Sequence, residues 1–107
     1  MKGKAVYNPG VKLSIIIPAY NEERHIRKLL ERVDAVRVEG IEKEIIIVDD
    51  GSSDGTRAIL EDEKQRGRTV IFHAKNRGMG AALRTGIAAA TGDLLIIQDA
   101  DLEYNPA

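Results

Sequence analysis

Residues 44–56 read EIIIVDDGSSDGT, in which the apolar run 45–48 leads directly into two carboxylates and then into a turn of Gly, Ser and Asp. An unbroken run of β-branched residues is typical of a strand buried on both faces, as in a parallel sheet covered by helices. Because an unpaired buried carboxylate is costly, we expect Asp49 and Asp50 to emerge at the carboxyl end of this strand, facing solvent, a cation or ligand donors. Open α/β sheets bind their ligands at this edge.

The composition of the chain limits the classes of protein to consider. Its 107 residues suit a single domain, and 16 basic against 17 acidic residues leave a net charge of −1. This balance predicts no nucleic-acid partner. The lack of cysteine excludes disulfides and thiolate chemistry. No apolar run reaches the roughly 20 residues of a membrane span, and residues 1–12 lack the apolar core of a signal peptide, so we expect a soluble, cytoplasmic chain.

Further apolar runs predict additional strands. Residues 1–12 are broken by Gly and Pro and predict a flexible lead-in. Because Pro18 has no N–H to donate to a central ladder, we expect it to end the strand that precedes it. The expected strands span residues 13–17, 45–48, 69–72 and 94–97.

Helical patterns alternate with these strands. The first helix is expected to follow Asn21 as its N-cap. The second is expected to begin after Ser53 or Asp54 and to end near Gln65, and the third to cover residues 81–91, whose small side chains allow close packing on a sheet. This alternation predicts an α/β fold, an open, mainly parallel Rossmann-like sheet with helices on both faces. The apolar stripe of the first helix comprises Ile26, Leu29, Leu30 and Val33.

Because parallel strands all end at one edge, we expect functional residues to gather there. Asp99 and Asp101 follow the last strand, separated by one residue, so that both carboxylates can reach one point. Two such charges repel unless a cation lies between them, and hard oxygen ligands suit Mg²⁺ or Mn²⁺, with substrate phosphates completing the shell. Alternatively, one aspartate caps a turn and the other is solvated. The loops expected at this edge are residues 18–22, 49–50, 76–80 and 99–101.

Other residues of this edge have both a binding and a structural interpretation. Ionised Asp49 and Asp50 accept hydrogen bonds and so suit the donors of a ribose or a nucleobase, while either can also cap the next helix. The loop 76–80, NRGMG, can offer backbone N–H groups to phosphate or can be a simple tight turn. Tyr20 can stack on a ligand or hydrogen-bond to it at the mouth of the cleft, or lie half-buried.

Basic side chains give weaker signals. Arg77 and Arg84 can neutralise phosphate, although an arginine on a helix surface is usually solvated. His25 and His73 form no metal-binding pattern with each other or with acids. We expect both histidines at the surface or at an edge and assign neither a catalytic role.

Four motifs, in this order, resemble the nucleotide-sugar-binding half of glycosyltransferase family 2: SIIIPAYNEE, EIIIVDDGSSDGT, NRGMGAALRTGI and ATGDLLIIQDADLEYNP. The resemblance runs from Leu13 to Pro106. Within the family, GAALRTG and DADLEYNP are most similar to the dolichyl-phosphate mannose synthases and related polyprenyl-phosphate glycosyltransferases. The resemblance implies a GT-A fold truncated after the fourth strand, with a donor-binding part over residues 13–107 that follows the lead-in.

Carried over by motif position, the resemblance also implies a site and a reaction. The first two motifs line the nucleotide pocket, and the DxD sequence Asp99, Ala100 and Asp101 holds Mg²⁺ or Mn²⁺ on the diphosphate of a UDP- or GDP-linked sugar. The sugar is transferred with inversion, for instance to a polyprenyl phosphate, a lipid that places the full-length protein at the cytoplasmic face of a membrane. The residues implied in the pocket are Pro18, Tyr20, Glu22, Val48 and Asp50.

Family members continue past the DxD sequence with the acceptor-binding part and any catalytic base, and neither is present in these residues. We therefore expect a chain that binds donor and metal but is incomplete for transfer, and its catalytic base is unknown. The last strand is expected to lack a neighbour on one side. Such an edge favours self-association.

Two other functions remain open at this point. In a receiver domain of two-component signalling, IIIVDDG would be the acidic pair and LLIIQDADLEYNP the strand that carries the phosphorylated aspartate. Against this, a strand and a helix over residues 13–36 precede the acidic pair, and no later strand offers the Thr or Ser and the Lys of such switches. The other alternative is a non-catalytic nucleotide-binding domain.

Overall fold

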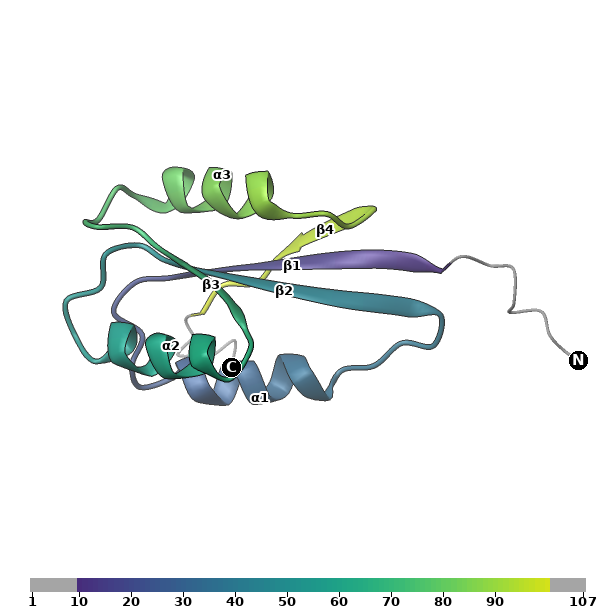
Figure 1. Cartoon of the computed structure of the whole chain (residues 1–107), viewed down its shortest axis with the longest axis horizontal. Coiled ribbons are helices and arrows are strands. Elements are labelled where there is room, and N and C mark those ends of the chain that lie inside the picture. The colour runs from purple at the N-terminus through teal and green to yellow at the C-terminus, as the bar shows by residue number, and fades with distance from the viewer. Residues whose placement is uncertain (1–9, 101–107) are drawn as a thin grey trace, which may run out of the picture.

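The computed structural model describes residues 10–100, so that residues 1–9 of the expected lead-in and Asp101 lie outside the described residues. The sheet order is β3-β2-β1-β4, and every strand pair is parallel. Helices α1 and α2 cover one face of the sheet and α3 covers the other (Figure 1). The α/β fold predicted from the alternating pattern is therefore confirmed. The elements are β1 (Val11–Ala19), α1 (Ile26–Ala35), β2 (Ile41–Asp49), α2 (Thr56–Gln65), β3 (Thr69–Phe72), α3 (Met79–Ala89) and β4 (Leu94–Ile97).

The two middle strands carry the core, because β1 and β2 present apolar side chains to both faces of the sheet. Ile17 and Ile47 pack on the face covered by α1 and α2. Ile16, Ile46 and Val48 pack on the opposite face, against α3. Each of the five is at most 1% exposed. This confirms the strand buried on both faces that residues 45–48 predict.

Pro18 lies inside β1 and does not end it as expected. β1 pairs with β2 as far as Ala19 but with β4 only as far as Ile16. The Ile16 carbonyl accepts the Gln98 N–H on the β4 side, and the Ala19 carbonyl accepts the Asp50 N–H on the β2 side. Because successive residues of a strand alternate in direction, Pro18 faces the β4 side, beyond the last paired residue there. No ladder partner at that position requires its missing N–H.

Helix α1 begins at Ile26, four residues later than an N-cap at Asn21 would place its start. Asn21 has a left-handed backbone, with φ of 52°. Its side-chain Oδ1 accepts the N–H groups of Ser53 (2.8 Å) and Asp54 (3.3 Å), so it stabilises the neighbouring loop and not its own helix. The apolar stripe of α1 is confirmed. Its buried residues are Ile26, Leu29, Leu30 and Val33.

The other helix boundaries lie close to the expected ones. The N-cap of α2 is Gly55 and not Ser53 or Asp54, although the side chain of Asp54 accepts the Thr56 N–H at 2.9 Å just before the helix. Gly67, with φ of 109°, follows the C-terminus of α2, which ends at Gln65 as expected. Helix α3 begins at Met79, two residues before the expected start.

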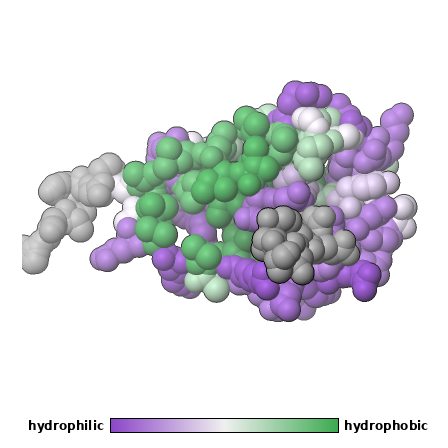
Figure 2. Space-filling model, turned by 180° about the vertical axis from the view of Figure 1, so that it is seen from behind, coloured by the Kyte–Doolittle hydropathy of each residue, from purple (hydrophilic) through white to green (hydrophobic). Residues whose placement is uncertain are grey.

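Strand β4 is the most exposed apolar element of the described chain. It lies at the edge of the sheet, as expected, and its four residues, Leu94–Ile97, are 47–54% exposed. Seen from behind the view of Figure 1, apolar side chains form a continuous area on the surface (Figure 2). Within residues 10–100, no helix combines the length and the apolar character that a membrane span requires.

Candidate functional site

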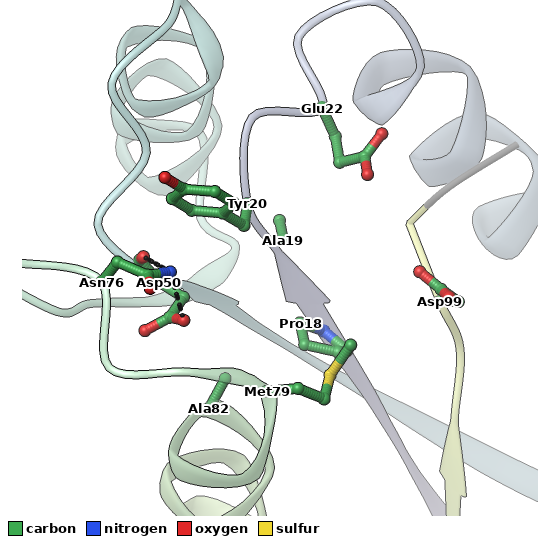
Figure 3. Close-up of a pocket in the computed structure, with 9 residues that line it drawn as sticks. All are labelled: Pro18, Ala19, Tyr20, Glu22, Asp50, Asn76, Met79, Ala82 and Asp99. Carbon is green, nitrogen blue, oxygen red and sulfur yellow. Dashed lines mark hydrogen bonds between the residues drawn. The ribbon is translucent and has the colours of Figure 1, made fainter. Parts of the chain in front are cut away.

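A cavity of about 350 Å³ lies at the carboxyl edge of the sheet. Side chains from the ends of β1, β2 and β4 and from the start of α3 surround it (Figure 3). The loops that the sequence predicts at one edge therefore do converge. The cavity lies at the end of β1. Strands β2 and β3 are on one side of β1 in the sheet, and β4 is on the other. The lining residues are Pro18, Ala19, Tyr20, Glu22, Asp50, Asn76, Met79, Ala82 and Asp99.

The position of the cavity follows from the strand order. From β1 the chain adds β2 and then β3 on one side, and it then crosses over α3 to place β4 on the other side of β1. The point where the chain changes the side on which it adds strands is called a topological switch point. There the loops that leave the two neighbouring strands run in opposite directions and leave a crevice between them. Pro18 at the end of β1 and Asp99 after β4 line the crevice because these two strands are neighbours.

Most of the sequence-predicted site residues meet at this cavity, and two do not. Pro18, Tyr20, Glu22, Asp50 and Asp99 line it. The side chains of the other two described residues face the core, since both Val48 and Ala100 are 0% exposed and belong to its apolar clusters. Asp101 lies outside the described residues. The sequence did not single out Ala19, Met79 or Ala82, whose small or apolar side chains carry no chemical signal of a site.

Asp50 is buried and hydrogen-bonded within the chain, contrary to the expectation that it faces solvent, a cation or ligand donors. Asp50 is 3% exposed. Oδ1 lies 2.7 Å from His73 Nδ1 and accepts the Arg77 N–H at 2.9 Å. Oδ2 accepts hydrogen bonds from the side chain of Asn76 and from the Gly78 N–H, each at 2.9 Å. Burial of the carboxylate is tolerated because each oxygen has two partners.

Asp49 is also buried, at 0% exposure, which contradicts the same expectation. Its Oδ1 accepts the hydroxyl of Ser52 at 2.6 Å, and its Oδ2 accepts the Ser52 N–H at 3.3 Å. This side chain closes the turn that follows β2. Asp49 therefore has a structural role in this turn and not as a helix cap, and it does not line the cavity.

The pKa of Asp50 reflects two opposed effects. Burial raises the pKa, and the hydrogen bonds from His73 and from the N–H groups of Arg77 and Gly78 lower it by more. The net result is a pKa below the ordinary value, because donors that point at a carboxylate favour its charged form. One fixed negative charge therefore stands at the wall of the cavity at neutral pH.

His73 is buried and bonded on both ring nitrogens, so the expectation of a surface or edge histidine is wrong. It is 6% exposed, and its Nε2 lies 2.8 Å from the hydroxyl of Thr85 on α3. This placement follows from the register between β2 and β3, which the sequence alone does not reveal. Phe72, the last residue of β3, pairs with Asp49, so His73, the residue after this strand, comes opposite Asp50.

In the loop after β3, backbone N–H groups donate hydrogen bonds to a side chain of the same chain and not to a ligand. The amides of Arg77 and Gly78 donate to Asp50, so the interpretation of this loop as a tight turn holds for them, and not that of a phosphate cradle. The side chains of Arg77 and Arg84 are exposed and do not line the cavity. The solvated interpretation of these two arginines therefore fits the structure.

Hydrogen bonds fasten the loop after β1 to the loop after β2. The N–H of Asn21 donates to Ser52 Oγ at 2.9 Å, and that of Glu22 donates to Thr56 Oγ1 at 2.8 Å. These bonds place two lining side chains. Glu22 faces the cavity, and the ring of Tyr20, 45% exposed, stands at its mouth (Figure 3).

Asp99 supplies an exposed carboxylate at the β4 side of the cavity. Within residues 10–100, no group of three or more His, Cys, Asp or Glu side chains could hold a metal ion by itself. A hard cation that shares its shell with water and phosphate oxygens needs only one or two carboxylates. The donor set on this side of the cavity therefore fits a divalent ion that arrives with a phosphate ligand, with Asp101 the second expected carboxylate.

Comparison with known proteins gives a family and a set of similar folds. The family model described as glycosyl transferase family 2 matches residues 14–107. The chain is 40% identical over 104 residues to undecaprenyl-phosphate 4-deoxy-4-formamido-L-arabinose transferase of Klebsiella pneumoniae, covering 94% of this chain and 32% of that protein. It is 35% identical over 97 residues to dolichol-phosphate mannosyltransferase of Pyrococcus furiosus, covering 90% and 27%.

Solved structures agree with this result. The mannosyltransferase PcManGT of Pyrobaculum calidifontis, solved with GDP-Man and Mn²⁺, matches with a TM-score of 0.73 and 28% identity over 86% of this chain and 28% of that chain. TarS of S. aureus, solved with UDP-GlcNAc, matches with a TM-score of 0.73 and 30% identity over 84% and 26%. The GT-A fold implied by the four motifs is thereby confirmed.

The chain spans about a third or less of the length of these curated relatives. The match nevertheless covers nearly the whole of this chain, and it decides against the receiver domain. The chain belongs to glycosyl transferase family 2.

Proposed function

We propose that this chain is the donor-binding part of a glycosyltransferase that transfers a sugar from a nucleotide diphosphate sugar to an acceptor, with inversion. The observation that carries the proposal is the cavity at the switch point of the sheet, where the ends of β1, β2 and β4 bring Asp50 and Asp99 to the same space. A ligand with a nucleoside at one end and a diphosphate at the other suits this space, because Asp99 and Glu22 offer carboxylate oxygens to a cation and to hydroxyl groups while Asp50 forms part of the wall.

We propose that the nucleoside lies on the Asp50 side of the cavity. The exposed ring of Tyr20 can stack on a base there, and Pro18 offers an apolar wall beside it. Glu22 offers acceptor oxygens to ribose hydroxyl groups. Since Val48 and Ala100 are buried, we propose that they support the cavity from behind and do not touch the ligand.

We propose that Asp99 and Asp101 hold Mg²⁺ or Mn²⁺ on the diphosphate. The PcManGT structure was solved with GDP-Man and Mn²⁺, which supports a metal with this ligand class. When bound, such a cation neutralises the charge that develops on the leaving diphosphate. The chain itself would place the diphosphate beside Asp99, on the β4 side of the cavity.

The names of the curated relatives support a polyprenyl phosphate as the acceptor. A phosphate acceptor is already ionised at neutral pH and needs no general base, whereas a hydroxyl acceptor does. A lipid acceptor would place the full-length protein at the cytoplasmic face of a membrane. Since the relatives are about three times longer, we expect these 107 residues alone to bind donor without completing transfer.

Calorimetric titration with UDP-, GDP- and dTDP-linked sugars, with and without Mn²⁺, tests the proposal. We expect one of these donors to bind, and Mn²⁺ to tighten its binding by about tenfold or more, as a charge-bridging ion should. Asp99→Asn and Asp101→Ala should each abolish the metal-dependent part. Asp93→Asn is the matched control. Asp93 directly precedes β4, so it lies at the end of this strand opposite to Asp99, where it accepts the Lys12 N–H.

The titration has a clear negative outcome. Binding that Mn²⁺ does not change, or that Asp99→Asn and Asp93→Asn weaken equally, would contradict the role of Asp99. The absence of binding for all three donors would contradict the proposed function itself.

We also propose that the exposed edge of β4 associates with a second copy of the chain. The outer side of β4 has no neighbouring strand among the described residues, and its apolar side chains are about half exposed on both faces. Two identical edges can pair antiparallel across a twofold axis and cover these side chains together.

A further inference from the structure

We propose that His73 is a positioning residue that acts through Asp50 to hold the loop 76–78 in the shape that lines the cavity. The proposal rests on the proposed function, because the cavity matters only if it binds a nucleotide. His73 does not line the cavity itself. Its effect must therefore pass through a residue that does.

His73 stands between two elements that flank the site. Its N–H donates to the Asp49 carbonyl at 2.8 Å, which fixes the backbone at the end of β3. Its ring lies between Asp50 Oδ1, 2.7 Å from Nδ1, and Thr85 Oγ1 on α3, 2.8 Å from Nε2. With only 5% of its side chain exposed, the ring is shielded from solvent on both sides.

These contacts determine where the proton is. Asp50 is an acceptor only, so the hydrogen bond at 2.7 Å requires a proton on His73 Nδ1. Thr85 is compatible with this arrangement, because its hydroxyl can donate to a bare Nε2 or accept from a protonated one. A ring protonated on Nε2 alone would place the Nδ1 lone pair against a carboxylate oxygen. The buried environment therefore selects a ring that donates to Asp50.

Asp50 passes this constraint to the loop. The same carboxylate accepts the amide of Asn76 and the N–H groups of Arg77 and Gly78, which are consecutive in the chain. With four donors on its two oxygens, the carboxylate has one orientation that satisfies all of them. Without the His73 donor, one oxygen keeps a single partner and the carboxylate is free to turn. Asn76 and Met79, which line the cavity on either side of these amides, would then lose their fixed position.

A merely structural histidine would fill space, whereas a positioning histidine must donate from Nδ1. His73→Leu keeps an apolar side chain of similar size and removes the donor. His73→Asn places an amide N–H near the former Nδ1 and keeps the donor while removing volume. Val70→Ala is the matched control for lost stability, because Val70 is a buried residue of the same strand that packs in the core on the α1 and α2 side.

The first measurement needs no nucleotide. Amide hydrogen exchange of the ligand-free chain should be at least about tenfold faster at Arg77 and Gly78 in His73→Leu, and near wild type in His73→Asn and Val70→Ala. Nitrogen-15 spectra of the imidazole should show a protonated Nδ1. Unchanged exchange in His73→Leu, equal loss in His73→Leu and His73→Asn, or a ring protonated only on Nε2 would overturn the proposal.

The second measurement is titration of each variant with UDP and with GDP in the presence of Mn²⁺. His73→Leu should weaken the binding of the preferred nucleotide by about tenfold, and His73→Asn should restore it to within about threefold of wild type. If the wild-type chain binds neither nucleotide, the proposed function fails, while the exchange data still decide whether His73 holds the loop. If wild type binds and His73→Leu binds equally well, the positioning role fails.

Discussion

At the scale of single residues, the acidic pair after β2 shows how far sequence reasoning reaches. The cost of burying a charge correctly predicts that Asp49 and Asp50 come at the end of the strand. It did not predict that both are buried, because the donors that compensate Asp50 come from residues 76–78, whose path depends on the conformation of a glycine-containing loop. His73 was missed for a related reason, because its partners also come from segments distant in the sequence. Its role depends on the register between β2 and β3, which a single sequence does not contain.

The lowered pKa of Asp50 predicts a particular dependence of stability on pH. A carboxyl with a lowered native pKa stabilises the fold above its ordinary value of 3.8, and this contribution is lost as pH falls from there through the native pKa. In Asp50→Asn, the new amide group faces donors, so we expect a loss of about 2–4 kcal/mol in the free energy of unfolding at pH 7. The difference from wild type should shrink at pH 3.

Urea unfolding of both proteins at pH 7 and at pH 3 checks this prediction. Wild type should lose more stability between the two pH values than Asp50→Asn does. Equal losses in the two proteins would mean that the Asp50 carboxylate contributes no pH-dependent stability and that its hydrogen bonds are weaker than their lengths indicate.

At the scale of elements, the apolar runs predict strands better than helix starts. The expected strands 69–72 and 94–97 have the bounds of β3 and β4, since turn residues flank both runs. The predicted start of α1 was wrong because Asn21, a residue type that is common at N-caps, bonds to another loop instead. The prediction that Pro18 ends the first strand was wrong because β1 no longer pairs with β4 at this position, so the missing N–H of Pro18 is not needed. Both errors concern contacts between segments distant in sequence.

The close packing of α3 on the sheet gives a prediction for two glycines of the same helix. A Cβ on Gly86 would lie 2.4 Å from Ile16 Cγ2, a stiff β-branched side chain in the core. Gly86→Ala should therefore destabilise the chain by about 1–3 kcal/mol, despite the better helix propensity of alanine. A Cβ on Gly80 meets only Arg84 Nη1, at 3.5 Å, so Gly80→Ala should stabilise by up to about 1 kcal/mol.

Thermal or urea unfolding of the two variants checks the prediction. The opposite signs separate a packing effect from a general effect of alanine in this helix. If Gly86→Ala were as stable as Gly80→Ala, the close approach of α3 to β1 would not be a constraint on the fold.

At the scale of the whole molecule, the meeting of four loops at one edge was predictable, and the strand order was not. All-parallel strands bring residues 18–22, 49–50, 76–80 and 99–101 to the same edge in any order. The order β3-β2-β1-β4 places Asp99 beside Pro18. The crossover through α3 is long enough to place β4 on either side of the sheet, so packing of the complete chain decides it.

The exposed edge of β4 predicts concentration-dependent association. Sedimentation equilibrium of the chain should detect a dimer that Ile96→Lys removes, because a charge on the edge strand opposes edge pairing. Ile87→Lys is the control, since Ile87 is an exposed apolar residue that belongs to helix α3 and not to the edge strand. A monomer at all concentrations, or a dimer that both variants weaken equally, would contradict the assignment of this edge.

The central claim is that the carboxyl edge of the sheet holds a nucleotide and its cation together. Paramagnetic relaxation of backbone amides by Mn²⁺, added with UDP or GDP, tests it most directly. The effect should be strongest at Gln98, Asp99 and Ala100, and weak at Asp93, about 20 Å away at the other end of β4. Relaxation centred away from Asp99, or equal at Asp93 and Asp99, would contradict the account.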